Sequence, residues 1–199
     1  MLELKTEASV GGGLGVWEAI HRRRSVRAYT GQPVAREDVL RLLDAAVQAP
    51  TAMLEEPLAF AVVQDRRTLE RLSARALDLL PELRPRGAAA AGFIPPADVF
   101  HGAGTLIVIY GKPLGPFVAA DCWLAAENLM LAACGLGLGT CVIGLALSAL
   151  NEPAWRAELG APPGAYAHAP IVVGAPAEET PAPGRRAPEI VSWRTPLSA

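Results

Sequence analysis

The sequence contains little charge. Asp, Glu, Lys and Arg make up 19% of its 199 residues, against about 25% in typical soluble domains. Lysine occurs only as Lys5 and Lys112, and the formal net charge is −2. A chain without a basic excess has no general attraction to nucleic acid or to anionic lipid. We therefore expect neither nucleic acid nor a membrane as a partner.

Cysteine is equally scarce. Cys122, Cys134 and Cys141 are odd in number, well separated and set in apolar sequence. This pattern argues against a disulfide framework and favours a reducing compartment. We therefore expect a cytoplasmic protein.

Apolar residues are abundant by contrast. They make up 51% of the chain, which is ample for a core, while 19 glycines and 18 prolines indicate many loops. With a prior of about 150 residues per domain, we expect residues 1–199 to form a single domain.

One uncharged run, 129–150, is long enough to span a bilayer. Glycines interrupt it at alternate positions from 135 to 139, and the TCVIG that follows is typical of a buried strand. The run is flanked by Glu127 and Glu152 rather than by basic residues. A helix, a turn and a buried strand are therefore favoured over a membrane span.

Hydrophobic periodicity predicts helices and strands that alternate along the chain. Helices are expected at 16–23, 37–49, 68–80, 121–134 and 153–159, and strands at 58–64, 105–110, 140–144 and 170–174. This order indicates an α+β or α/β domain. The 121–134 helix is so apolar that it must be buried nearly all round, and this surplus suggests an oligomer interface.

Three segments fall outside these elements. Residues 1–15 are expected to form a flexible N-terminal extension. The Pro/Gly/Ala-rich stretch 81–104 is too long for an ordinary connector and is predicted to be a lid loop. Residues 175–199 are expected to form a C-terminal arm, in which EIVSW (189–193) could make an edge strand.

Common catalytic signatures are missing. The sequence has no HExxH, no GxSxG and no CxxC, and His21, His101 and His168 lack metal-ligand spacing. The glycines of GLGLGT follow a helix and precede a strand, the reverse of a dinucleotide-binding turn. We therefore expect no metal site, and no side chain is assigned as a catalytic acid or base.

Two clusters carry chemical information. Residues 22–27 (RRRSVR) hold four arginines and a serine, whose donors suit phosphate oxygens; a solvated basic face is the alternative. Residues 49–58 (APTAMLEEPL) form a loop between two prolines, which could present backbone groups to a ligand at low entropic cost or act only as a rigid connector. Within it, the adjacent Glu55 and Glu56 are expected to be solvated.

Several blocks in order resemble the nitroreductase family. They are AIHRRRSVRAYTGQPV, LLDAAVQAPTAMLEEPLAFAVVQD, DCWLAAENLMLAACGLGLGTCVIG, and APIVVGAP with GRRAPEI. The resemblance runs from about Ile20 to Trp193. It implies an α+β three-layer sandwich, in which helices flank a central, mostly antiparallel sheet. It also implies an intertwined homodimer with two flavin mononucleotides (FMN) at the interface.

The resemblance also implies site residues. The flavin phosphate and ribityl chain would be held by Arg23, Arg24, Ser25 and Arg27, together with Arg186 or, as the alternate, Arg185. The loop that reaches the flavin from the other subunit would contribute Pro50, Thr51, Ala52 and Leu54. The stretch after GLGT would pass along the flavin ring and bring in Ile143 and Gly144.

The loop at 51–58 departs from the family pattern. Thr51-Ala52 stand where Ser-Ser is frequent, Leu54 replaces Asn, Glu56 replaces Gln and Leu58 replaces Trp. Loss of the amide at position 54 removes a polar contact that would contribute about 0.5–1.5 kcal/mol. We expect flavin binding to survive, and the departures put the substrate choice and the rate in question.

The implied function is an FMN-dependent oxidoreductase. NADH or NADPH would give hydride to the flavin, and a nitroaromatic, a quinone or a similar small acceptor would then take the electrons. The alternatives are a flavin-binding dimer with little turnover, and a related enzyme with different flavin chemistry.

Overall fold

A computed structural model describes residues 14–52, 56–80 and 94–195 of the chain. Its helices are α1 (Val16–Arg22), α2 (Arg36–Val47), α3 (Arg66–Asp78), α5 (Val118–Gly135), η3 (Gly144–Ala146), α6 (Leu147–Leu150) and α7 (Pro153–Glu158). Its strands are β1 (Leu58–Val63), β2 (Thr105–Gly111), β3 (Gly139–Val142) and β4 (Tyr166–Gly174). Every helix and strand expected from periodicity is therefore confirmed, with shifted ends.

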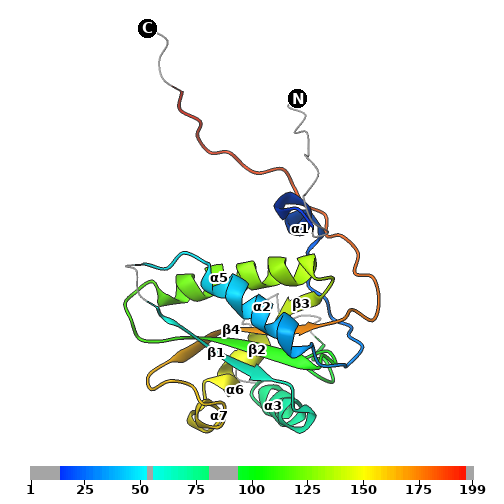
Figure 1. Cartoon of the computed structure of the whole chain (residues 1–199), viewed down its shortest axis with the longest axis vertical. Coiled ribbons are helices and arrows are strands. Elements are labelled where there is room, and N and C mark those ends of the chain that lie inside the picture. The colour runs from blue at the N-terminus through cyan, green and yellow to red at the C-terminus, as the bar shows by residue number, and fades with distance from the viewer. Residues whose placement is uncertain (1–13, 53–55, 81–93, 196–199) are drawn as a thin grey trace.

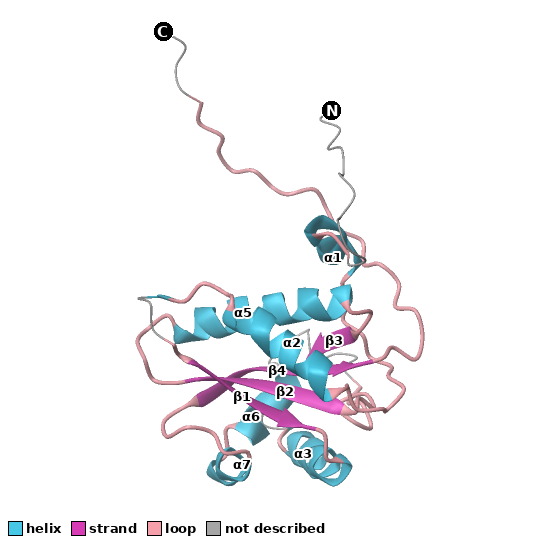
Figure 2. Cartoon of the chain, in the orientation of Figure 1, coloured by secondary structure: helices cyan, strands magenta, loops and turns pink. Residues whose placement is uncertain are grey.

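The four strands form one sheet in the order β1-β2-β4-β3. All three neighbouring pairs are antiparallel. Helices α1, α2 and α5 lie on one side of this sheet, and α3, α6 and α7 lie on the other (Figures 1 and 2). The expected three-layer α+β sandwich is confirmed.

Side-chain alternation along β2 builds a core on each face of the sheet. Leu106, Val108 and Tyr110 pack in the core that contains α3, α6 and α7. Ile107 and Ile109 pack in the core that contains α2 and α5. A strand covered on both faces needs apolar residues at every position, which is why TLIVIY has no polar residue after its threonine.

Helix α5 is the main support of its layer, although it is not buried all round. Eight of its residues are buried, including Asp121. Trp123 and Leu124 remain 44% and 46% exposed on its outer side. Among the residues described, no helix is long and apolar enough to cross a membrane, and the 129–150 run is divided among α5, β3, η3 and α6.

The chain after α1 lies against the free edge of β3. Ser25 forms a parallel bridge with Thr140, and the Val26 amide donates to the Thr140 carbonyl at 2.9 Å. Gly139 permits this approach, because a Cβ at that position would lie 2.7 Å from Val26 Cγ2. The edge strand is thereby covered, and the arginine-rich segment is fixed to the sheet.

The C-terminal arm starts beside the same segment. The Ala177 amide donates to the Ala28 carbonyl at 2.9 Å, after which the arm passes α1 and extends away from the sandwich (Figure 1). Its described part, 175–195, contains no helix or strand, so EIVSW forms no edge strand within one chain.

The other two segments are described only in part. Residues 1–13 and 81–93 lie outside the described residues, so the N-terminal extension and the first half of the lid loop stay predictions. In the second half, Val99 and Phe100 are each only 1% exposed. This part is therefore packed into the core.

Candidate cofactor-binding site

The arginine cluster is positioned by buried neighbours in the sequence. Val26 and Tyr29 are buried, and the Tyr29 hydroxyl donates to the Val26 carbonyl at 3.0 Å. Burial raises the pKa of Tyr29, so the hydroxyl stays a donor. With these two side chains anchored, Arg23 and Arg24 are left half-buried and Arg27 exposed beside β3.

Four arginines surround a cavity of about 230 Å³. Its walls come from the segment after α1 and from the arm: Arg23, Arg24, Ser25, Arg27, Thr180, Pro181, Pro183 and Arg185. Arg23 Nε lies 3.4 Å from Glu127 Oε1, and Arg24 Nη1 donates to the carbonyls of His21 and Arg23. The cavity therefore has excess positive charge and two hydroxyl groups, which suits a phosphate-sized anion.

Arg27 also lines a second cavity, of about 340 Å³. This one lies along the end of β3 and is mostly apolar: Ile94, Pro96, Val99, His101, Cys141, Val142, Ile143, Gly144 and Leu145. The Ile143 amide donates to the Pro170 carbonyl at 2.8 Å, which fixes the turn into η3. Burial raises the pKa of the Cys141 thiol, although Arg27 and Arg23 oppose the shift, so this thiol is uncharged.

The loop at 50–52 lies elsewhere. The Ala52 amide donates to the buried carboxylate of Asp121 at 3.1 Å, near the start of α5, whereas Ser25 and Val26 meet Thr140 beyond its end. Residues 121 and 135 are separated by about 21 Å of helix at 1.5 Å per residue. Figure 1 likewise shows the two segments at opposite ends of α5. One chain therefore does not bring Pro50, Thr51 and Ala52 to the arginine cavity.

Two further expected residues stand apart from these cavities. Leu54 lies outside the described residues. Arg186 is exposed and absent from the walls of both cavities, whereas its neighbour Arg185 lines the first. The alternate assignment, Arg185, therefore has the better geometry.

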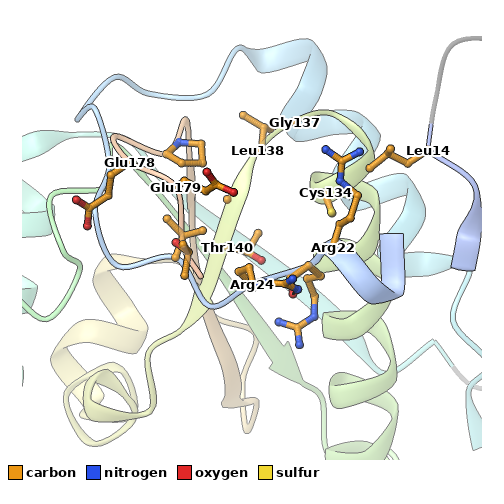
Figure 3. Close-up of a pocket in the computed structure, with 14 residues that line it drawn as sticks. Leu14, Arg22, Arg24, Cys134, Gly137, Leu138, Thr140, Glu178 and Glu179 are labelled. Atoms are coloured by element: carbon orange, nitrogen blue, oxygen red, sulfur yellow. The ribbon is translucent and has the colours of Figure 1, made fainter. Parts of the chain in front are cut away.

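A third cavity, of about 420 Å³, adjoins the first and shares Arg23, Arg24 and Thr180 with it. Figure 3 shows Glu178 and Glu179 on one side of this cavity and Arg22 on the other. Carboxylates on its wall make it a poorer anion site than the first cavity.

The cavities also contain residues that motif reading missed. Thr180 comes from the arm, and His101 comes from the turn before β2. Neither stands in a periodic pattern or close in sequence to the arginine cluster. Only the course of the folded chain brings them to the site.

The fold and the cavities define a class of protein. It is an α+β sandwich with a basic cavity at a sheet edge, joined through one arginine to a mostly apolar cavity. Such a pair of cavities suits a ligand that has an anionic end and a flat, apolar end.

A model of the nitroreductase family matches residues 20–174. A relative from Archaeoglobus fulgidus is 32% identical over 162 residues, which cover 80% of this chain and 84% of the relative. Another, from Methanothermobacter thermautotrophicus, is 37% identical over 126 residues, which are 63% of this chain and only 59% of the relative. Both are provisionally named NADH dehydrogenase/NAD(P)H nitroreductase.

Among solved structures, a nitroreductase with bound FMN from Bacteroides fragilis superposes with a TM-score of 0.76. It is 26% identical and the superposition covers 90% of this chain and 98% of that chain. The chain belongs to the nitroreductase family, and the resemblance seen in the sequence is confirmed.

Proposed function

We propose that the protein is an FMN-dependent oxidoreductase that takes hydride from NADH or NADPH and reduces a nitroaromatic, a quinone or a similar small acceptor. The observation that carries this proposal is Arg27, which lines both the arginine cavity and the cavity at Ile143 and Gly144. FMN has the matching form, with a phosphate at one end and a flat ring at the other. The FMN bound to the Bacteroides fragilis relative supports the same assignment.

The residues present fit this cofactor. A phosphomonoester carries a charge of about −1.5 to −2 at neutral pH, and the arginine cavity offers guanidinium donors from Arg23, Arg24, Arg27 and Arg185, with Ser25 and Thr180 beside them. Ile143 and Gly144 would border the ring. When bound, FMN would supply hydride transfer, while the protein would orient it, bind the acceptor and exclude water.

We also propose a homodimer as the active form. Exposed large apolar side chains gather on the α1–α2–α5 layer: Val16, Trp17, Ile20, Leu40, Val47, Phe117, Trp123, Leu124 and Leu136. Helices α3, α6 and α7 expose none in their described residues. A second copy on the α1–α2–α5 face would cover this surface.

A dimer would also account for the loop at 50–52. That loop lies away from the arginine cavity of its own chain, so we assign Pro50, Thr51, Ala52 and Leu54 to the flavin of the partner. The arm carries exposed Ile190, Val191 and Trp193, which suit the same interface. The three cysteines are unpaired, in keeping with the reducing cytoplasm that we propose as its location.

The test is the absorption spectrum of the purified protein, followed by NADH or NADPH addition without oxygen. We expect a flavin spectrum that bleaches and then recovers when a quinone or nitroaromatic is added. Bleaching without recovery would indicate a flavin-binding protein with little turnover rather than a reductase. A protein that neither carries nor takes up FMN would refute the proposal altogether.

A further inference from the structure

The turn at 98–103 is held rigidly beside the second cavity. The Asp98 carboxylate accepts hydrogen bonds from the amides of Phe100 and Gly102 at 2.9 and 2.8 Å, and from the Ser73 hydroxyl at 2.8 Å. Ser73 is a buried residue of α3, and its oxygen accepts from the Val99 amide at 3.0 Å. The turn is therefore fixed to both the helix and the core.

His101 stands at the tip of this turn in a left-handed conformation. Its φ is 56°, and it is the one non-glycine residue with positive φ in the part of the chain that the structure describes. Histidine is enriched in this region relative to most residues, as are asparagine and aspartate. Glycine would adopt this left-handed conformation without cost. The backbone conformation therefore does not account for the presence of an imidazole at this position.

The imidazole lines the second cavity together with Arg27, Ile143 and Gly144. Burial, and then the positive charge of Arg27, lower the pKa of His101, while Asp98 opposes the shift. Besides Arg27, the other titratable wall group is Cys141, whose thiol stays neutral because burial raises its pKa. Among the described wall residues, His101 is thus the one that can release and regain a proton most readily.

We propose that His101 is a catalytic residue of the reductase, which contacts the acceptor in this cavity and gives a proton to its oxygen. This inference rests on the proposed function. Reduction of a quinone to a hydroquinone consumes two electrons and two protons, and a hydride equivalent carries both electrons and one proton. The second proton would come from the imidazolium: its N–H bond breaks, an O–H bond forms on the quinone, and solvent reprotonates the half-buried ring.

A lowered pKa makes the imidazolium a stronger acid than that of an ordinary histidine, while a smaller fraction of the ring is protonated at neutral pH. General acid catalysis contributes typically 10²- to 10⁴-fold. Water also reaches His101, so loss of the imidazole should cost less, about tenfold or more in the rate of quinone reduction.

His101→Asn is the variant of choice. Asparagine tolerates the left-handed conformation and keeps a hydrogen-bond donor, but it does not ionise. His168→Gln is the matched control. His168 is also half-buried with a pKa lowered by burial, but it lies on β4 against the Tyr166 ring and outside the cavity walls.

Two acceptors separate proton transfer from electron transfer. 1,4-Benzoquinone needs a proton, whereas ferricyanide takes one electron and no proton. We expect His101→Asn to lower kcat/KM for benzoquinone about tenfold or more and to leave ferricyanide reduction within about twofold. His168→Gln should change neither. Equal losses with both acceptors, or no loss with benzoquinone, would overturn the assignment.

Proton NMR gives a readout that does not depend on turnover. The chain has only 3 histidines, so each imidazole C2–H signal is assigned by its loss in the corresponding variant. Adding FMN to flavin-free protein should shift the His101 signal and leave the His168 signal in place. If the native protein binds FMN and reduces benzoquinone while the His101 signal does not move, His101 is not part of the site, but the proposed function stands. If the native protein does not bind FMN, the role of His101 and the proposed function are both refuted.

Discussion

Replacement of Gly139 by alanine should damage the proposed flavin site, because it would push the arginine segment away from the edge of β3. The new Cβ would lie 2.7, 2.9 and 3.0 Å from Cγ2, Cβ and Cγ1 of Val26, whereas carbon atoms pack at about 3.5–4.0 Å. Rotation of the Val26 side chain does not move its Cβ. The backbone of Val26 must therefore move away from β3, and Ser25 and Arg27 must move with it.

The size of the effect follows from this contact. Overpacking of a core costs about 1–3 kcal/mol. For a chain of this length, 1 kcal/mol corresponds to about 2–4 °C in Tm, so we expect a fall of roughly 2–12 °C. Loss of one charge-assisted phosphate contact, of about 1.5–3 kcal/mol, should weaken FMN binding about tenfold or more.

Gly135→Ala is the control, because a Cβ there meets no atom within 4 Å and alanine favours the end of α5 by up to about 1 kcal/mol. Thermal unfolding and FMN titration of flavin-free protein should separate the two variants. Adding Val26→Ala removes both Cγ atoms, so it should recover part of the affinity that Gly139→Ala loses. If the Gly139 and Gly135 variants have the same Tm and the same affinity, β3 does not hold the arginine segment in place.

Three further predictions follow from the site and its supports. Arg185→Ala should weaken FMN binding about tenfold or more, while Arg186→Ala should have a smaller effect; titration of the flavin-free variants decides between the two arginines. Asp98→Asn should lower Tm at neutral pH. Burial raises the pKa of the Asp98 carboxyl, but the hydrogen bonds from Phe100, Gly102 and Ser73 outweigh this effect and hold the pKa below 3.8. The difference in Tm should therefore persist above about pH 3.8 and vanish as the pH falls through the lower folded pKa; a constant difference would contradict the argument. Trp123→Glu should abolish dimerisation and FMN retention together, measured by light scattering and by flavin content, whereas a monomer with full flavin would show that one chain builds the site.

The fold was predictable because its signals are local. The apolar run that follows Thr105 in β2 indicates a strand covered on both faces, and the periodicity of α2 and α3 indicates which sides are buried. The first and last residues of each helix and strand were less predictable. Helix α3 begins at Arg66 rather than Thr68 because the Asp65 side chain accepts from the Thr68 amide and caps the helix. Strand β4 begins at Tyr166 rather than Pro170, and a bulge opposite Ile109 and Tyr110 breaks its alternation.

From residue patterns alone, the site was predictable only where its residues are neighbours in sequence, and Arg185, Ile143 and Gly144 were named only through the family resemblance. Arg23, Arg24, Ser25 and Arg27 form one short block, so their charge was visible at once. Arg185 reaches the same cavity because the arm follows residues 28–30, a course set by hydrogen bonds between distant segments. The conformation of His101 depends on the Asp98 turn and on Ser73, and no periodic pattern reports either.

The two ends of the proposed flavin site have different supports, which separates cofactor retention from acceptor choice. The phosphate end is fixed to the sheet through Val26 and Thr140, within one chain. The acceptor end is bordered by turns, and the loop at 50–52 that we assign to it from the partner is tied to its own chain by the bond from Ala52 to Asp121. The departures at Thr51 and Ala52 fall on that loop. They are therefore expected to alter which acceptors bind while leaving the grip on the phosphate unchanged.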